Sequence, residues 1–131
     1  MQRNGLTAAL RELIKDIQSK HNVQIHLQIL KEVIINKEKE IHVFRILQEI
    51  ISNALKHANA KNIYISLHEK NSNLEVTVKD DGIGFDIEKT KEERCGLGLK
   101  LLESRIEILN GQMSFESLPN KGTSYFFKAP L

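Results

Sequence analysis

The sequence predicts an α+β fold: a mixed sheet of about five strands with three main helices on one face, a two-layer α/β sandwich. Along the chain, segments with apolar residues at helical spacing alternate with segments in which apolar and polar residues alternate. Their order is helix, strand, helix, strand, strand, loop, helix, strand, strand, which suits helices stacked on one sheet. A length of 131 residues, with 40% hydrophobic and 27% charged residues, fits one globular domain with its own core.

The chain is expected to open with a helix and a strand. Asn4 is a suitable N-cap for the helix. The apolar residues behind it share one helical face: Leu6, Ala9, Leu10, Leu13, Ile14 and Ile17. A half-buried strand over residues 23–29 follows, because Val23, Ile25, Leu27 and Ile29 alternate with polar residues.

The strongest helix prediction covers residues 37–58. Its apolar stripe consists of Phe44, Leu47, Ile51, Ala54, Leu55 and Ala58. Its opposite face consists of Arg45, Gln48, Glu49, Ser52, Asn53 and Lys56. We expect this helix to pack on the sheet through the apolar stripe.

The remaining elements are two hairpins separated by a loop and a helix. Strands over residues 63–67 and 74–78 flank a polar turn at 70–73, which predicts an antiparallel hairpin. Residues 80–98 hold four glycines and a charged stretch without apolar periodicity. A helix is predicted from Leu97, with Leu99, Leu102, Ile106 and Leu109 facing inward and Gly111 as the left-handed residue after its end. Segments 113–115 and 123–127 close the fold as a second hairpin.

Composition excludes several classes of protein. A single cysteine, Cys95, rules out an internal disulfide framework and fits a reducing compartment, so we expect a cytoplasmic domain. No apolar run reaches the roughly 18 residues of a membrane span, although a longer parent protein could be membrane-anchored. A net charge of +2 gives no reason to expect nucleic-acid binding.

The long helix carries the first group of candidate functional residues. Glu49 and Asn53 are four residues apart and share a face, with Lys56 one turn further on. A carboxylate, an amide oxygen and an ammonium on one face suit Mg²⁺ with a phosphate ligand. A solvated polar face would look the same, so this pattern alone does not decide between the two.

The second candidate is the end of the strand over residues 74–78, where two carboxylates and two glycines follow. A carboxylate such as Asp80 could accept a hydrogen bond from an exocyclic amine like that of adenine. Gly82 and Gly84 would let a ligand approach the backbone closely. A tight turn is the alternative interpretation of the same residues.

The third candidate is Gly96-Leu97-Gly98-Leu99, which opens a predicted helix. Free N–H groups at a helix N-terminus bind phosphates. The segment is neither a Walker A loop, since no Lys-Ser/Thr follows the glycines, nor a dinucleotide fingerprint, since no strand precedes it. A hinge leading into a helix is the alternative.

The order and spacing of these three motifs resemble the GHKL ATPase superfamily, which has the Bergerat fold. More narrowly, the chain resembles the ATP-binding domain of bacterial two-component sensor histidine kinases, of the subfamily paired with LuxR/NarL-type response regulators. The residues that carry this resemblance are RILQEIISNALKHA at 45–58, GLGLK at 96–100 with ESRIE at 103–107, and KGT at 121–123. It covers nearly the whole chain, from about Gly5 to Leu131.

The resemblance implies ATP and Mg²⁺ as cofactors and assigns roles to named residues. Asn53 would ligate the metal, and Glu49 would position or polarise groups near it. Asp80 would accept from the adenine amine, and Thr123 would support Asp80 through a water. The remaining nucleotide-binding positions would be Lys56 at phosphate, His57, Gly82 and Gly84 in the pocket, and Gly96, Gly98 and Leu99 at the phosphates. Residues 86–95 would form a short ATP lid whose Lys89, Lys91 or Arg94 offsets phosphate charge.

The same resemblance implies partners and a domain division. Residues 1–4 would be a start or linker remnant and 5–131 the catalytic domain. The phosphorylated histidine would lie on a separate dimerisation domain, with a response regulator acting downstream, so this chain should be monomeric and should not phosphorylate itself. Alternatives are a stand-alone GHKL serine kinase that binds a sigma factor, a binding module that has lost catalysis, and a fragment of a GHKL hydrolase.

Other polar residues suggest no site. His21, His26, His42 and His68 show no metal-ligand spacing and are expected at the surface or at edges. Cys95 adjoins a helix start but has no visible catalytic partner.

Overall fold

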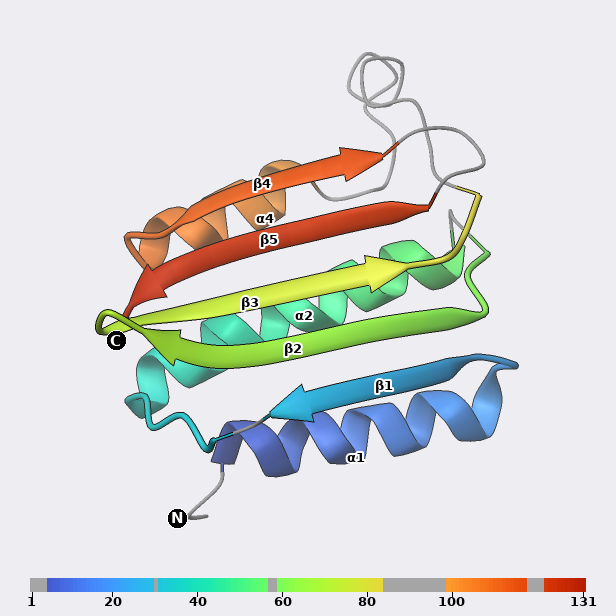
Figure 1. Cartoon of the computed structure of the whole chain (residues 1–131), viewed down its shortest axis with the longest axis horizontal. Helices are drawn as coiled ribbons and strands as arrows, with labels where there is room; N and C mark the ends of the chain where they lie inside the picture. The colour runs from blue at the N-terminus through green and yellow to red at the C-terminus, as the bar shows by residue number, and fades with distance from the viewer. Residues whose placement is uncertain (1–4, 30, 57–58, 84–98, 118–121) are drawn as a thin grey trace.

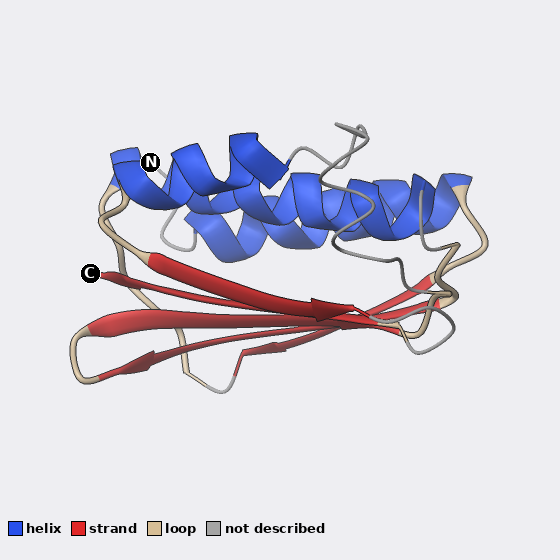
Figure 2. Cartoon of the chain, turned by 90° about the horizontal axis from the view of Figure 1, so that it is seen from above, coloured by secondary structure: helices blue, strands red, loops and turns tan. Residues whose placement is uncertain are grey.

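A five-stranded mixed sheet forms one layer of the protein and helices form the other (Figures 1 and 2). The computed structural model describes residues 5–29, 31–56, 59–83, 99–117 and 122–131. Within these ranges the helices are α1 (Gly5–Lys20), α2 (Lys37–Lys56) and α4 (Leu99–Ile108). The strands are β1 (Gln24–Ile29), β2 (Asn62–Lys70), β3 (Asn73–Asp80), β4 (Gln112–Ser117) and β5 (Thr123–Pro130). The predicted fold class, with three main helices on one face of about five strands, is confirmed.

The strand order is β1-β2-β3-β5-β4, with β1 parallel to β2 and all other neighbours antiparallel. Because β1 and β2 are parallel, the chain has to return between them, and α2 makes that return across the sheet. Both predicted hairpins are present, as β2–β3 and β4–β5. This arrangement brings the end of β3 beside the start of β5 at one end of the sheet.

The core lies between the two layers. The inward residues of α1 are Leu6, Leu10 and Ile14, as predicted from their spacing, while Asn4 lies outside the described residues. On the sheet, β2, β3 and β5 bury alternate residues, as their patterns predicted. No helix in the described ranges is long and apolar enough to cross a membrane.

Helix α2 is rotated about its own axis relative to the predicted orientation, so a different set of its residues faces the sheet. Its buried residues are Val43, Ile46, Leu47, Ile50, Ile51, Asn53 and Ala54. Phe44 and Leu55, which the predicted stripe included, are only partly buried. Asn53, assigned to the polar face, is just 2% exposed. The wide apolar surface of this helix allows several rotations about its axis, and the sheet beneath it selects one of them.

Asparagines lie at two of the helix ends, the start of α2 and the end of α4. Asn36 Oδ1 accepts a hydrogen bond from the Lys39 N–H at 2.9 Å, which makes it the N-cap of α2. After α4 the left-handed residue is Asn110, with φ of 58°, so the assignment of that conformation to Gly111 was wrong. Gly111 is instead pressed against the sheet, where a Cβ would lie 2.5 Å from the Lys128 carbonyl oxygen. The predicted helix start at Leu97 lies outside the described residues.

Candidate functional site

The candidate site lies at the end of the sheet where β3 ends and β5 begins, beside the C-terminal end of α2 (Figure 1). Strand register places Asp80 opposite Thr123, and Thr123 opposite Ser117 of β4. Asp80 shares its face of β3 with the buried Val76 and Val78, so its side chain is directed to the helix side of the sheet. Three polar side chains from three adjacent strands therefore gather at this end.

Asp80 is a partly buried carboxylate that the backbone holds in place. Its Oδ1 accepts a hydrogen bond from the Gly82 N–H at 2.8 Å. Burial raises the pKa of this carboxyl above its usual value; hydrogen bonds from the Gly82 and Thr123 N–H groups oppose the rise and the nearby Asp81 charge adds to it. A carboxylate oriented by two backbone donors suits the recognition of a ligand donor.

Asp81, the next residue, has a structural role. Its Oδ1 accepts hydrogen bonds from the N–H groups of Lys61 and Asn62, at 2.9 and 2.8 Å, and its Oδ2 accepts one from Asn62 Nδ2 at 2.9 Å. These bonds, with the Asn62 side chain contributing most, lower the pKa of Asp81. Asp81 therefore connects the chain after β3 to the start of β2. Both of its carboxylate oxygens already accept hydrogen bonds within the protein, so it is a poorer candidate for ligand binding than Asp80.

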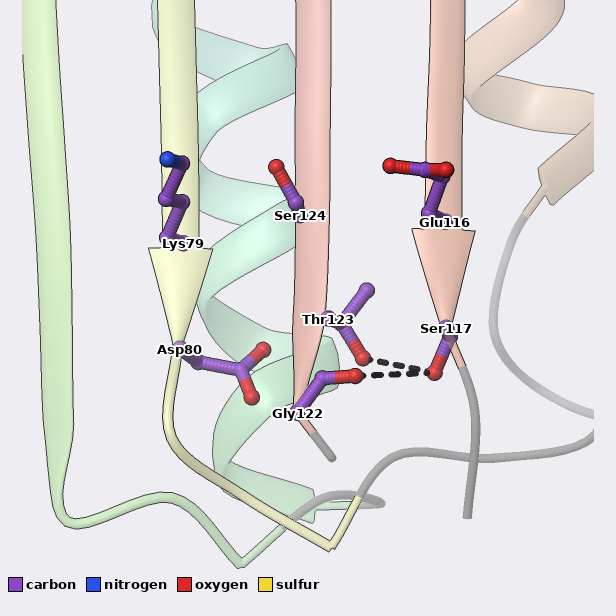
Figure 3. A pocket seen from close by; sticks show the side chains of 7 residues that line it. All are labelled: Lys79, Asp80, Glu116, Ser117, Gly122, Thr123 and Ser124. Atoms are coloured by element: carbon purple, nitrogen blue, oxygen red, sulfur yellow. Dashed lines mark hydrogen bonds between the residues drawn. The ribbon is translucent and has the colours of Figure 1, made fainter. Parts of the chain in front are cut away.

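Thr123 and Ser117 form a buried hydroxyl pair. Their hydroxyl oxygens lie 2.8 Å apart, and both residues are buried (Figure 3). Gly122, directly before Thr123, has φ of +77°, and a Cβ there would lie 2.3 Å from the Asp80 carbonyl oxygen. Only glycine fits that approach between β3 and β5. Ser117 was not identified from the sequence, because a lone serine at a strand end carries no signal of its own.

Helix α2 contributes a second set of polar groups. Asn53 is buried, Glu49 is partly buried and Lys56 is exposed. Tyr125 of β5 connects this set to the sheet, since its phenol forms a hydrogen bond with the Asn53 side chain. Burial raises the pKa of Tyr125 to about 12; the Asn53 bond opposes the rise, while the charges of Asp80 and Glu49 add to it. Tyr125 is thus bonded to Asn53 and close enough to Asp80 and Glu49 for their charges to act on its phenol.

A hollow of about 380 Å³ opens at this end of the sheet (Figure 3). Its lining includes Asp80, Ser117, Gly122 and Thr123, together with Lys79, Glu116 and Ser124. The last three alternate with inward residues along their strands, so they belong to the face away from the helices. The hollow therefore shares with the candidate site only the residues at the ends of the strands, namely Asp80, Ser117, Gly122 and Thr123.

Several predicted site residues fall outside the described part of the chain: His57, Gly84, Gly96, Gly98 and the lid residues 86–95, with Cys95. Leu99 begins α4. Gly82 donates its N–H to Asp80, as given above. Among the described residues, no cluster of His, Cys, Asp and Glu could hold a metal ion. Of the histidines, His21 and His26 are exposed, whereas His42 is partly buried.

Comparison with known proteins gives the family. Residues 38–131 match the family described as histidine kinase-, DNA gyrase B-, and HSP90-like ATPase. The histidine-protein kinase/phosphatase DegS of Brevibacillus brevis is 29% identical over 128 residues, covering 97% of this chain and 33% of that protein. The sensor histidine kinase LiaS of Bacillus subtilis is 32% identical over 131 residues, covering 100% of this chain and 36% of that protein. The chain thus spans about a third of the length of these relatives.

Solved structures show the same fold. The catalytic domain of histidine kinase ThkA superposes with a TM-score of 0.77 at 19% identity, covering 99% of this chain and 92% of that one. The histidine kinase domain of the Erythrobacter litoralis EL346 blue-light activated kinase gives a TM-score of 0.78 at 20% identity, covering 95% of this chain and 58% of that one.

With the match over most of its length and the shared two-layer fold, this chain belongs to the family of histidine kinase-, DNA gyrase B-, and HSP90-like ATPases, and its named relatives above are histidine kinases.

Proposed function

We propose that this chain binds ATP with Mg²⁺ and donates the γ-phosphate to a histidine on a separate dimerisation domain, in a two-component pathway of the kind that ends on a LuxR/NarL-type response regulator. The family supplies ATP binding. The observation that supports the rest is the placement of Asp80, Thr123 and Ser117 on adjacent strands at one end of the sheet, with the buried Asn53 in the last turn of α2.

The donor set at this end fits the proposed ligands. A buried carboxamide near carboxylates offers the oxygen ligands that Mg²⁺ prefers, with the rest of its shell left for water and phosphate. When bound, Mg²⁺ supplies charge neutralisation on the phosphates. Asp80 accepts from the adenine amine, and the Gly82 and Thr123 N–H groups hold its carboxylate in position.

The other residues act by positioning and by charge. Thr123 lies beside Asp80 in register, where its hydroxyl can support that carboxylate through a water. Lys56, exposed at the end of α2, reaches the phosphates, and the N-terminal backbone of α4 at Leu99 meets them. His57, Gly84, Gly96 and Gly98 complete this proposed site. Catalysis of this kind needs alignment of the γ-phosphate with the acceptor and little covalent chemistry from the domain.

Calorimetric titration with ATP tests the assignment of Asp80. Asp80→Asn keeps the shape of the side chain but turns one acceptor oxygen into a donor that repels the adenine amine, so we expect affinity to fall at least tenfold. Asp81→Asn is the matched control, because it removes the same charge one residue away and should bind ATP as the parent chain does. Unchanged affinity in Asp80→Asn would overturn the adenine role.

A further inference from the structure

Ser117 is a buried serine at the end of β4 that stands in line with the candidate site. It is 6% exposed and pairs in register with Thr123, which pairs in turn with Asp80, so the three residues form a row across β4, β5 and β3. Figure 3 shows the Asp80 carboxylate and the Ser117 hydroxyl directed toward Thr123 from the two sides of β5. Ser117 is therefore separated from the Asp80 carboxylate by Thr123 alone.

The Ser117 hydroxyl contacts the start of β5 at two points. Its Oγ lies 2.8 Å from Thr123 Oγ1, and it donates a longer hydrogen bond of 3.4 Å to the Gly122 carbonyl oxygen. A serine hydroxyl has one proton and two lone pairs, so it can bond both groups at once. Ser117 thus holds both backbone and side chain at the place where Gly122 brings β5 against the Asp80 carbonyl oxygen.

The bond to Ser117 selects the rotamer of Thr123. A threonine carries a hydroxyl and a methyl group on the same carbon, and rotation about χ1 exchanges their positions. Thr123 is 4% exposed, so its hydroxyl needs a partner inside the protein. Removal of the Ser117 hydroxyl would take away the 2.8 Å bond, and Thr123 would then lose the contact that favours this rotamer over the others.

We propose that Ser117 is a positioning residue for recognition of the base: it holds Thr123 in the rotamer whose hydroxyl supports the Asp80 carboxylate, and so strengthens the preference for a base with an exocyclic amine. This proposal rests on the proposed function, in which Asp80 accepts from the adenine amine and Thr123 supports that carboxylate. It gives a binding task to a residue that the sequence did not single out.

The test is calorimetric titration of the 131-residue chain with ATP and with purine riboside triphosphate, which is ATP without its exocyclic amine. The parent chain should prefer ATP, because only ATP offers Asp80 an amine. Ser117→Ala should lower the affinity for ATP about fivefold, the effect of roughly one hydrogen bond, and leave the affinity for purine riboside triphosphate unchanged. Ser117→Thr keeps a hydroxyl and should restore the affinity for ATP.

Further variants make the result specific to this contact. Ser114→Ala is the matched control, because Ser114 is exposed on the other face of β4, and it should leave both affinities unchanged. In a Thr123→Val background, Ser117→Ala should cause no further loss, because the hydroxyl that it positions is gone. Ser117→Cys keeps the size of the side chain with a weaker hydrogen-bonding group, and it should give the same selective loss if Ser117→Ala does not fold.

The outcomes separate the role of Ser117 from the proposed function. Equal losses for both nucleotides, or a lower melting temperature with both affinities unchanged, would overturn the positioning role and leave Ser117 a structural residue. A further loss in the Thr123→Val background would contradict it as well. A parent chain that binds the two nucleotides equally would instead overturn the adenine role of Asp80, and the role of Ser117 with it. A parent chain that binds neither would overturn nucleotide binding itself.

Discussion

Asp80 and Asp81 are adjacent carboxylates with opposite surroundings. Burial raises the pKa of Asp80, whereas hydrogen bonds from Asn62 and Lys61 lower that of Asp81. The difference agrees with the proposed ligand-binding role of Asp80 and with the structural role of Asp81. Ligand-binding groups are commonly held in environments that cost stability.

The opposite pKa shifts predict opposite dependences of stability on pH. Because the folded-state pKa of Asp80 is raised, its contribution to stability is present below about pH 3.8 and is lost as pH rises through the folded pKa. Asp80→Asn removes that cost, so we expect a higher melting temperature than the parent chain at pH 7 and no gain below pH 3.8. Thermal unfolding in a series of buffers measures both.

Asp81→Asn is the control for this experiment and should behave in the opposite way. The folded-state pKa of Asp81 is lowered, so its contribution is present above about pH 3.8 and is lost as pH falls through the folded pKa. A lower melting temperature at pH 7 is therefore expected for this variant. If the melting temperatures of both variants shifted in the same direction relative to the parent chain across this pH range, the different roles given to Asp80 and Asp81 would be contradicted.

The sequence singled out some of these residues and missed others. Asp80 and Thr123 were found because a strand end with Asp-x-Gly and the later Gly-Thr are local patterns. Tyr125 was assigned only to a strand, and Asn53, although named as the metal-ligand candidate, was placed on a polar helix face, whereas it is buried. Their contact depends on how α2 is rotated on the sheet, and no pattern within either segment contains that information.

At the scale of elements, the β2–β3 hairpin carries a strained turn. Lys70 pairs with Asn73, and the two residues between them, Asn71 and Ser72, have φ of 52° and 64°. Two consecutive positive φ angles define a type I′ turn, which prefers glycine at the second position. The polar residues at 70–73 predicted a turn, while its type follows from the strand register.

Ser72→Gly should therefore stabilise the protein. Glycine relieves the left-handed strain, so we expect the free energy of unfolding to rise by about 1 kcal/mol, as measured by urea denaturation. Ser114→Gly, at an exposed position within β4, is the matched control and should lower stability by about 0.5–1 kcal/mol. Destabilisation by Ser72→Gly would argue against the type I′ geometry.

The end of α4 shows why helix boundaries were only partly predicted. Both Asn110 and Gly111 can adopt left-handed backbone, and glycine does so at lower cost. The structure uses Asn110 there because Gly111 is needed for its small size against Lys128 of β5. A tertiary contact thus decided between two residues that the sequence left nearly equivalent.

At the scale of the whole molecule, the proposed nucleotide site lies at one end of the sheet, and the proposed reaction needs a partner domain that carries the histidine. Incubated with labelled ATP and Mg²⁺, the 131-residue chain should gain no phosphohistidine itself and should label a separately supplied dimerisation domain of a relative. An acid-labile, base-stable label on this chain would contradict the proposal that the phosphorylated histidine lies on a separate domain. Binding to a sigma factor, in place of the dimerisation domain, would favour the serine kinase alternative.

Taken by itself, the sequence determined the order of the elements, the two-layer fold and the three motifs that carry the family resemblance, because periodicity and short motifs are local properties of the chain. Only the tertiary structure decided the strand order that places Asp80 beside Thr123, the rotation that buries Asn53, and the contact of Asn53 with Tyr125. Register and helix rotation are set by how the whole core packs, which depends on residues far apart in the chain.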